Sequence, residues 1–307
     1  MGSSWSWRRG RPTAGLAVAV AALLTFHGVV PNTLLHLGSL LETVLVWLIL
    51  AVPVLVEVAV LRRSLLALVA SLLPVVAWFG VFGGGLLPAS GQFDVTVVQH
   101  NVNDVNPDPA GTARALAALR PDLIGLVEVT VPAYGEALAE QYPYSTVQGT
   151  VGLWSRYPLV DARHLDIKPA GLAADWNRGL RAVARTPFGD VAIYVVHLPS
   201  VRLGPTAGFN TTRRDDSARK LGAVLKAEPL SRLILIGDLN STVDDRGLRP
   251  VSSQLTWPAA DYALSWPAGA PVARIDQVMA RGAKVISVRT LPRTTSDHLP
   301  IAAHVKV

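Results

Sequence analysis

LILIGDLN, at residues 233–240, is an apolar run that ends in an acid and an amide. An uncharged, aliphatic run of this length is typical of a strand that is buried on both faces of a sheet. A carboxylate that directly follows such a strand is held rigidly at the edge of the sheet, where a ligand can reach it. Asp238 and Asn240 are therefore the first candidate site residues.

The same arrangement recurs at other places, where polar side chains lie at the ends of apolar segments. These residues are Asn101 and Asn103, Glu128, His197, Asp276, and Asp297 with His298. Carboxylate and amide oxygens are the hard ligands that Mg²⁺ prefers, and one or two carboxylates plus a substrate phosphate suffice to bind it. The two histidines suit proton transfer near neutral pH. The sequence therefore predicts a site for Mg²⁺, with Mn²⁺ as the alternative, at the strand ends.

The segments around these residues read as short strands with a few helices between them. Asp108-Pro109 is a good helix start, with Asp as the N-cap and Pro at the first helical position. A second, amphipathic helix is expected at 215–226, and 187–190 reads as a hairpin turn. The predicted strands are 94–101, 122–128, 151–155, 181–186, 191–197, 233–237, 275–280 and 300–307. This order favours an α+β fold or a layered sandwich over a continuous βαβ series.

The charge balance excludes little about the substrate. The chain has 307 residues and a formal net charge of +6, of which the part from Gly91 onward carries about half. A nucleic-acid-binding domain usually shows a stronger basic excess on one face, so the charge does not by itself imply a nucleic acid. The chain has no cysteine, which excludes disulfides, a zinc thiolate site and a cysteine nucleophile.

Three apolar stretches precede the strand-rich part, at about 13–31, 39–61 and 64–87. About twenty residues at 1.5 Å per residue cross about 30 Å of hydrocarbon. Residues 1–90 are therefore predicted to be a membrane anchor with three transmembrane helices, and residues 91–307 the catalytic domain. We expect a multi-pass protein of the plasma membrane.

The orientation follows from the arginines that flank the spans. Arg8, Arg9 and Arg11 precede the first span, and Arg62 and Arg63 lie between the second and third. Positively charged residues concentrate on the cytoplasmic side, so the N-terminus is predicted to be cytoplasmic and the catalytic domain extracytoplasmic. A cleaved signal peptide at the first span is the alternative, although no clear small-residue cleavage site follows it.

Six motifs in order resemble those of the endonuclease/exonuclease/phosphatase superfamily, of a membrane-anchored bacterial type. They are QHNVN (99–103), PDLIGLVEV (121–129), VVHLPS (195–200), GDLNS (237–241), RIDQV (274–278) and TSDHLPI (295–301). The resemblance covers residues from about 93 to 307, and the superfamily includes DNase I, exonuclease III, neutral sphingomyelinases and inositol-polyphosphate 5-phosphatases. It implies an α/β fold, the four-layer α/β sandwich of DNase I-like proteins.

The resemblance also implies a role for each residue. Glu128 is similar to the principal Mg²⁺ ligand, with Asn101, Asn103 and Asp297 near the metal. His298 is similar to the general base that prepares a water for in-line attack on phosphorus, oriented by Asp276. Asp238 and Asn240 resemble the pair that positions the nucleophile and the phosphoryl oxygens. His197 resembles a phosphate-binding residue or the acid near the leaving oxygen.

Two positions depart from the usual motifs of the superfamily, and two arginines are candidate substrate contacts. Asn103 stands where many members have an Asp, which weakens a second metal contact. His197 stands where enzymes of the exonuclease III type usually carry Tyr or Asn, which favours the DNase I, sphingomyelinase and 5-phosphatase branches. Arg178 and Arg181 lie where members often place substrate contacts. The basic stretch Arg213, Arg214, Arg219 and Lys220 is expected to be a solvated helix face.

The expected activity is hydrolysis of a phosphodiester or phosphomonoester at the outer face of the membrane. The alternatives are an extracytoplasmic nuclease of the DNase I kind and a phospholipase-C- or sphingomyelinase-like hydrolase of lipid-linked phosphate. A short linker to the third span mildly favours the lipid-linked class, and nucleic acid stays an open one. A non-catalytic membrane receptor is the remote alternative, and no obligate protein partner is evident.

Overall fold

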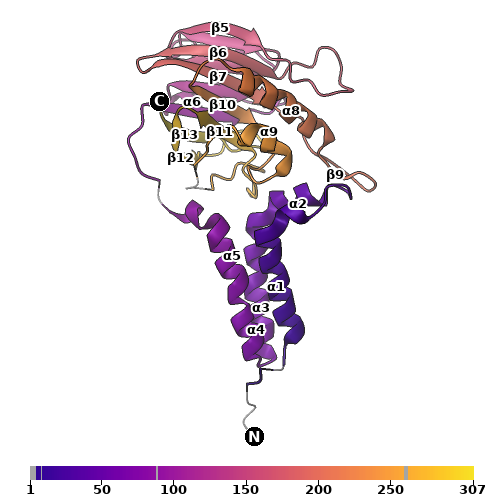
Figure 1. The fold of residues 1–307 in the computed structure, drawn as a ribbon. Coiled ribbons are helices and arrows are strands. Elements are labelled where there is room, and N and C mark those ends of the chain that lie inside the picture. Colours follow the sequence, from indigo (N-terminus) through magenta and orange to yellow (C-terminus); the bar gives the residue numbers. More distant parts are fainter. Residues whose placement is uncertain (1–4, 8, 88, 259–261) are drawn as a thin grey trace.

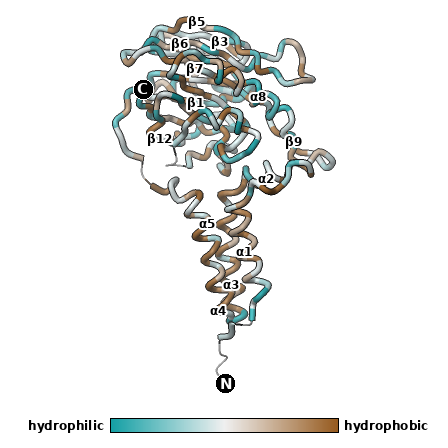
Figure 2. Tube along the Cα trace, viewed as in Figure 1, coloured by the Kyte–Doolittle hydropathy of each residue, from teal (hydrophilic) through white to brown (hydrophobic). Residues whose placement is uncertain are grey.

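Three apolar helical segments stand below a layered globular part (Figure 1). The computed structural model describes residues 5–7, 9–87, 89–258 and 262–307. The segments cover Arg11–Val29, Leu37–Leu61 and Leu65–Leu86, and each is long and apolar enough to cross a membrane. These bounds lie close to the predicted spans, and Figure 2 shows the apolar residues continuing along all three segments.

Each apolar segment is built from α-helix extended by short 3-10 turns. Along the chain these are α1 (Arg11–Phe26), η1 (His27–Val29), α2 (Leu37–Val44), η2 (Leu45–Leu50), α3 (Ala51–Leu61), α4 (Leu65–Ala70), α5 (Leu72–Phe82) and η3 (Gly83–Leu86). The hydroxyl of Ser64 caps α4 by accepting a hydrogen bond from the Ala67 amide. Many side chains on the outside of the bundle are apolar, a pattern that is typical of helices that lie in a membrane.

The globular part contains two large mixed sheets. The six-stranded sheet has the order β12-β13-β1-β2-β4-β3, and the five-stranded sheet has the order β11-β10-β7-β6-β5. The first sheet is formed by β1 (Val95–Asn101), β2 (Leu123–Val127), β3 (Tyr144–Gln148), β4 (Val151–Ser155), β12 (Lys284–Thr290) and β13 (Ile301–Lys306). The second is formed by β5 (Leu159–His164), β6 (Gly179–Thr186), β7 (Gly189–His197), β10 (Leu233–Asp238) and β11 (Asp276–Arg281). Only β1 with β2 and β7 with β10 pair in parallel among the ladders of these two sheets in the described residues.

Helices cover the outer face of each sheet. One apolar cluster fills the space between the sheets, where Val97 and Leu123 meet Ile193 and Ile236. A second cluster packs the six-stranded sheet against α6 (Pro109–Ala117) and α7 (Ala133–Leu138). A third packs the five-stranded sheet against α8 (Thr212–Ala227) and α9 (Arg249–Ser252). The order helix, sheet, sheet, helix confirms the predicted four-layer α/β sandwich.

Most predicted elements are present, and the exposed strands were missed. The helix predicted to start at Asp108-Pro109 is α6, and the Asp108 carboxylate caps it at the amide of Gly111. The predicted hairpin turn joins β6 to β7, with Gly189 at a φ of 112°. The strands β3, β5 and β12 were not predicted, because their partly exposed residues lack a continuous apolar run.

A buried ionic network joins the helical bundle to the sandwich. Glu42 on α2 is 1% exposed and accepts hydrogen bonds from the backbone N and the guanidinium Nε of Arg246, both at 2.9 Å. Beside them, the Ser39 hydroxyl donates to Asp245 at 2.9 Å. Because Glu42, Ser39 and Asp245 are buried and the Arg246 side chain is only 19% exposed, the bundle is docked on the sandwich and is more than a tether.

The sandwich has one small extension on the side that faces the bundle. The short strands β8 (Arg202–Gly204) and β9 (Gly208–Asn210) form a separate hairpin. The amide of Phe209 on β9 donates to the carbonyl of Leu35, and His36 is hydrogen bonded to Thr211 at 3.0 Å. The junction between anchor and sandwich is therefore continuous from α2 to the start of α8.

Candidate active site

The predicted site residues converge because the ends of several strands meet at one edge of the sandwich. Asn101 ends β1, and Glu128 directly follows its parallel neighbour β2 in the first sheet. In the second sheet, Asp238 ends β10 and pairs across the ladders with His197 of β7 and Asp276 of β11. The carboxyl ends of parallel neighbours lie at the same edge, so packing the two sheets face to face brings these groups together.

The amide of Asn101 bridges the two sheets. Its Nδ2 atom donates to Glu128 Oε1 and to Asp238 Oδ2, at 3.0 Å in both cases. A primary amide has two hydrogens, so it can satisfy both carboxylates at once. His197 Nε2 lies 3.7 Å from the same two oxygen atoms. These four side chains form one oxygen-rich cluster.

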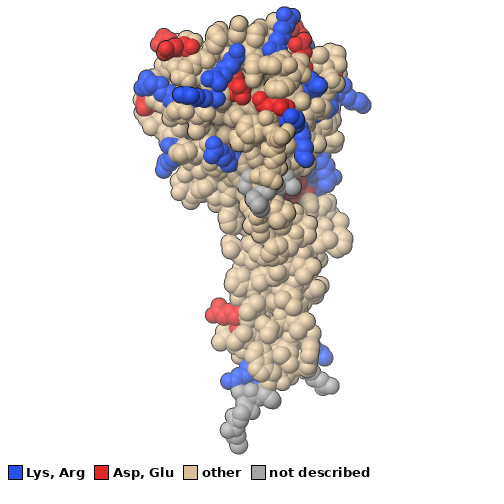
Figure 3. Space-filling view, turned by 90° about the vertical axis from the view of Figure 1, so that its left-hand side faces the viewer, with Lys and Arg blue, Asp and Glu red and all other residues tan. Residues whose placement is uncertain are grey.

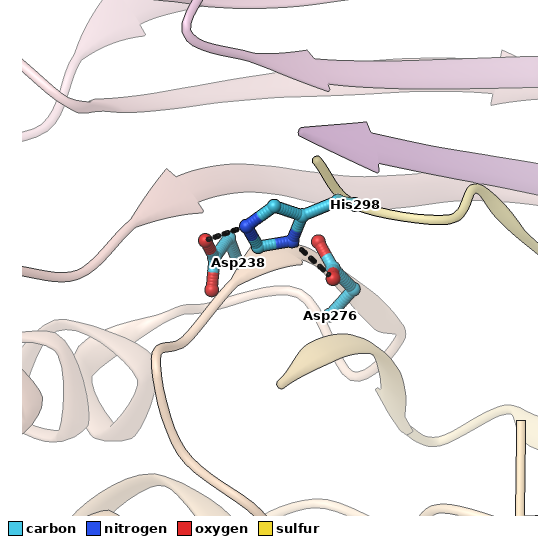
Figure 4. A group of neighbouring side chains, drawn as sticks. All are labelled: Asp238, Asp276 and His298. Atoms are coloured by element: carbon cyan, nitrogen blue, oxygen red, sulfur yellow. Dashed lines mark hydrogen bonds and ion pairs between the residues drawn. The ribbon is translucent and has the colours of Figure 1, made fainter. Parts of the chain in front are cut away.

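A second group consists of His298 between two acids. His298 Nδ1 lies 2.8 Å from Asp276 Oδ2, and its Nε2 lies 3.8 Å from Asp238 Oδ2. Figure 4 shows the imidazole ring with one nitrogen toward each carboxylate. Ser296 positions the ring, because its hydroxyl accepts from the His298 amide and donates to the Asn101 carbonyl.

Asn103, Asp297 and Asn240 line the rim of this cluster. The Asn103 side chain donates to Asp297 Oδ1 at 3.0 Å, and its backbone amide donates to Asn101 Oδ1. Asn240 donates from its side chain to the carbonyl of Leu198 and from its backbone to Asp238 Oδ1. Every predicted metal-binding and catalytic residue thus lies in or beside one cluster.

The backbone is strained at three of these positions. Glu128, Asn103 and Asn240 have φ angles of 65°, 63° and 47°, in the left-handed region that residues other than glycine rarely adopt. Such conformations cost free energy and persist where the surroundings enforce them, as they do at ligand-binding sites. Here the enforcing contacts are the hydrogen bonds that hold these side chains toward the cluster.

Burial and neighbouring charges together raise the pKa of Asp238 and of His298 and lower the pKa of His197. Burial raises the pKa of Asp238, and the charge of Asp276 adds to the effect. Burial opposes the charged form of His298, but Asp276, and then Asp238, outweigh it and raise the His298 pKa to about 10. Burial, followed by the Arg178 charge, holds the pKa of His197 well below its usual value. The surrounding carboxylates by themselves therefore favour the protonated form of His298, whereas burial and Arg178 favour the neutral form of His197.

The donor set fits a hard divalent cation at Glu128 better than at His298. The nearest ligand atoms of Asp238, Asp276 and His298 all lie within 4.8 Å of one another, which satisfies the spacing of a metal site. However, the 2.8 Å contact between Asp276 and His298 holds a shared proton, which a metal ion would have to displace. Glu128 is partly exposed, and its Oε1 atom and Asp238 Oδ2 both accept from the Nδ2 atom of Asn101. Oxygen ligands with an open side match the requirements of Mg²⁺.

Of the two predicted substrate contacts, Arg178 lies at the site. Its NH1 atom lies 3.2 Å from His197 Nδ1, and its guanidinium lies over the ring of Trp176 at 5.8 Å. An arginine can only donate, so His197 Nδ1 accepts and is unprotonated, in agreement with its lowered pKa. Arg178 is therefore oriented by His197 toward the cluster.

The prediction for Arg181 is wrong. This residue is 3% exposed, and its Nε and NH2 atoms donate to the two carboxylate oxygens of Glu228 at 3.1 and 3.0 Å. Asp161 also contacts its guanidinium, and Tyr194 donates to Glu228 at 2.5 Å. Successive residues of a strand point to opposite faces, so a strand residue near the site need not point its side chain toward the site. The side chain of Arg181 lies in a buried ion pair instead. The role of Arg181 is structural.

The expectation for Arg214 is also wrong. It is 1% exposed, its NH1 lies 2.6 Å from Asp245 Oδ2, and the same NH1 donates to the carbonyl of Asn240 at 3.3 Å. Arg214 therefore supports the strained loop that follows β10. Its spacing to Ala218, Leu221 and Leu225 on the buried face of α8 is the helical signal that could have shown this.

Comparison with known proteins agrees with the geometry. No curated protein sequence matches the chain. Solved structures match with probability 1.00 and include humanized TDP2 from D. rerio, with 19% identity and a TM-score of 0.55 over 69% of this chain and 99% of that one. Sphingomyelinase C from Streptomyces griseocarneus has 19% identity and a TM-score of 0.51 over 71% and 99%. A beta toxin mutant from Staphylococcus aureus with bound magnesium ions has 16% identity and a TM-score of 0.54 over 69% and 99%.

These structures share the fold, and the family is shown by a second comparison. The model of the Endonuclease/Exonuclease/phosphatase family matches residues 98–298, which is about two thirds of the chain. The matched range includes every residue of the cluster from Asn101 to His298. The chain therefore belongs to the endonuclease/exonuclease/phosphatase family and is a phosphoester-hydrolysing enzyme.

Proposed function

We propose that the chain is a membrane-anchored, Mg²⁺-dependent phosphoesterase that works by in-line attack of a water activated by His298. Residues 1–90 anchor it, and residues 91–307 form the catalytic domain on the extracytoplasmic side. The observation that carries the proposal is the convergence of Glu128 and Asp238 on Asn101, next to the Asp276–His298 pair.

Glu128 is the principal metal ligand in this proposal, with Asn101, Asn103 and Asp297 beside it. When bound there, a divalent cation supplies positive charge that stabilises the phosphoryl oxygens and offsets the carboxylates around His298. The bound magnesium ions of the Staphylococcus aureus beta toxin support this choice of metal, as does the oxygen-only donor set. Mn²⁺ fits the same ligands.

His298 acts as the general base through Nε2 in its neutral form, which a cation held at Glu128 would favour because its positive charge would offset the carboxylates that raise the His298 pKa. This nitrogen lies 3.8 Å from Asp238, a separation that one water can bridge. The water oxygen forms a bond to phosphorus, its proton passes to Nε2, and the bond from phosphorus to the ester oxygen breaks. Asp276 holds the ring by accepting from Nδ1 and stabilises the imidazolium that forms.

The remaining residues bind the phosphate and the leaving group. Arg178 offers a charged donor to a phosphoryl oxygen, and its planar guanidinium suits that geometry. Neutral His197, between Arg178 and the carboxylates, lies beside the leaving oxygen. Asn240 and Asp238 orient the attacking water. A phosphoryl transfer site needs positioning, charge stabilisation and a base, and this set provides all three.

The face of the sandwich that Figure 3 shows does not favour a high-affinity nuclease. On the face drawn in Figure 3, Lys and Arg are interspersed with Asp and Glu over the sandwich. A protein that binds nucleic acid strongly presents a continuous basic track along the backbone of its ligand. A phosphate ester that needs no such track is therefore the better substrate class.

Metal removal is the first test. EDTA should abolish hydrolysis by the full chain, and Mg²⁺ should restore it. Glu128→Gln should raise the Mg²⁺ concentration needed for half-maximal rate, because the amide has no charge, whereas Glu140→Gln on the exposed surface should not. Activity that persists in chelator would disprove metal dependence.

The base is tested by substitution at His298. His298→Ala should lower turnover by about two to four orders of magnitude, the usual contribution of a general base. Asp276→Asn should lower the same parameter by less, because it keeps the shape and removes the charge. His164→Ala, at an exposed position on β5, is the control. Near wild-type turnover of His298→Ala would place the base elsewhere, with His197 the first candidate.

Arg178 and Arg181 provide a matched pair. Arg178→Met should raise KM about 10- to 100-fold, because it removes a charged hydrogen bond to the phosphate. Arg181→Met should leave KM unchanged but cost about 3–5 kcal/mol of stability, because Glu228 would stay buried without its partner. Steady-state kinetics and thermal unfolding of both variants measure the difference. The reverse pattern would restore Arg181 as the substrate contact.

Topology is tested by reporter fusions. The arginines at 8, 9, 11, 62 and 63 support a cytoplasmic N-terminus by the positive-inside rule. A C-terminal alkaline phosphatase fusion in a bacterial host should then be active, and a C-terminal green fluorescent protein fusion should be dark. The opposite pair of results would put the catalytic domain in the cytoplasm.

A further inference from the structure

A cavity of about 290 Å³ lies at the junction of the bundle and the sandwich. The bundle contributes Val46 of η2, Val81 and Phe82 of α5 and the backbone of η3. The sandwich contributes the segment Thr242–Asp244 after β10 and the segment Val272–Arg274 before β11. This junction cavity therefore has one wall made of two candidate membrane spans and another made of two loops of the catalytic part.

Aromatic residues place the junction cavity at the level of the membrane surface. The indole of Trp47 donates to the carbonyl of Val272 at 2.7 Å, and the hydroxyl of Tyr262 donates to the carbonyl of Phe82 at 3.0 Å. The indole of Trp78 donates to the carbonyl of Val46 at 2.7 Å. Trp and Tyr concentrate where hydrocarbon meets water, because one part of each ring system is apolar and another forms hydrogen bonds.

The two loops of the sandwich wall directly follow and precede the strands β10 and β11, which carry Asp238 and Asp276. Thr242 and Asp244 follow Asn240 within four residues, and Arg274 precedes Asp276 by two. Hydrogen bonds tie the two segments together, from Leu239 N to the Ile275 carbonyl at 2.9 Å and from Gln277 Nε2 to the Ser241 carbonyl at 3.3 Å. A ligand in the junction cavity would therefore contact the same loops that position the active site.

The two walls differ in polarity. Val46, Val81 and Phe82 make most of the bundle side apolar, and the Glu42 carboxylate on the same side is paired with Arg246. The apolar surface continues into the exposed apolar side chains of the spans. Both full charges that the loops contribute, Asp244 and Arg274, lie on the sandwich side. An amphipathic molecule matches this gradient when its apolar part faces the bundle and its polar part faces the loops.

The junction is also held in a fixed geometry. Glu42 lines the cavity and is itself held by Arg246, while Ser39 contacts Asp245. Asp245 in turn pairs with Arg214, which donates to the Asn240 carbonyl. A preformed cavity loses less free energy on binding than one that must be assembled, so this rigidity favours a specific ligand.

We propose that the junction cavity binds a lipid of the surrounding bilayer, and that the substrate of the active site is a phosphate ester carried by that lipid. This inference rests on the proposed phosphoesterase function and narrows its substrate class. The volume is at the lower end for small-molecule sites, about 300 Å³. It therefore admits the interfacial part of one lipid, whose acyl chains stay in the bilayer along α5 and whose phosphate faces the catalytic loops.

The experiment uses the full chain in detergent micelles and compares two kinds of substrate. One is the water-soluble diester bis(p-nitrophenyl) phosphate. The other is a mixture of phosphatidylglycerol, phosphatidylethanolamine and phosphatidic acid, with products identified by phosphorus NMR. Val46→Trp and Val81→Trp fill the junction cavity. Val54→Trp and Val76→Trp place the same side chain on exposed surfaces of the same two spans, away from it.

The cavity-filling variants should hydrolyse the lipids at least about tenfold more slowly than the wild type, because a few surplus carbons suffice to exclude a ligand from a fitted pocket. They should hydrolyse the soluble diester at the wild-type rate, and the control variants should match the wild type on both. Native mass spectrometry should show phosphatidylglycerol bound to the wild type and the controls, and lost from Val81→Trp.

Three outcomes would overturn the inference in distinguishable ways. Hydrolysis of the soluble diester or of DNA without any lipid product would refute a lipid substrate and leave the phosphoesterase function standing. Lipid hydrolysis that the cavity-filling variants retain would refute the junction cavity as the lipid site. No hydrolysis of any of these esters with Mg²⁺ present would refute the proposed function itself.

Discussion

Two carboxylates from different sheets, Glu128 and Asp238, are held together by the single amide of Asn101. Like charges in a low-dielectric site repel, so this approach persists only because each oxygen accepts a hydrogen and because the sheets are packed rigidly behind them. The apolar cluster between the sheets supplies that rigidity. The active site is thus a product of how one sheet is packed on the other, and the amide of Asn101 is the point where the two meet.

The same constraint explains the strain around the cluster. Side chains that must point at one spot from several loops cannot all do so with relaxed backbones, and Glu128, Asn103 and Asn240 adopt left-handed conformations. Free energy spent on this strain is recovered from the cores on either side of the sheets. Arg214 and Asp245 are buried and support the Asn240 loop. Asp245 also contacts Ser39, so contacts that help to hold the strained loop extend to the bundle.

The contact between Ser39 and Asp245 indicates that the bundle is more than a tether for the sandwich. A tether could be replaced by any apolar helix, but here Glu42 and Arg246 form a buried pair across the junction. Removing one partner of such a pair is costly, since the other is left charged and desolvated. The bundle is therefore part of the structure that fixes the loops after β10 and before β11.

The sequence by itself determined the elements whose signal is local. Continuous apolar runs gave the three candidate spans and the central strands, Asp108-Pro109 gave the start of α6, and the ordered motifs gave the family. The clustered residues could also be identified from the sequence, because a polar residue directly after a buried strand is held at the edge of the sheet. Exposed strands such as β3 and β5 were missed, since their side chains alternate without a continuous apolar face.

The position of each charged residue relative to the site depends on the tertiary structure. Arg178 and Arg181 stand three residues apart, yet one lies beside His197 and the other lies buried against Glu228. Arg214 looks like a solvated residue in its own segment but supports the Asn240 loop. The role of a charge depends on partners that are distant in the sequence and close in space, and those partners are set by how the sheets, α8 and the bundle pack together.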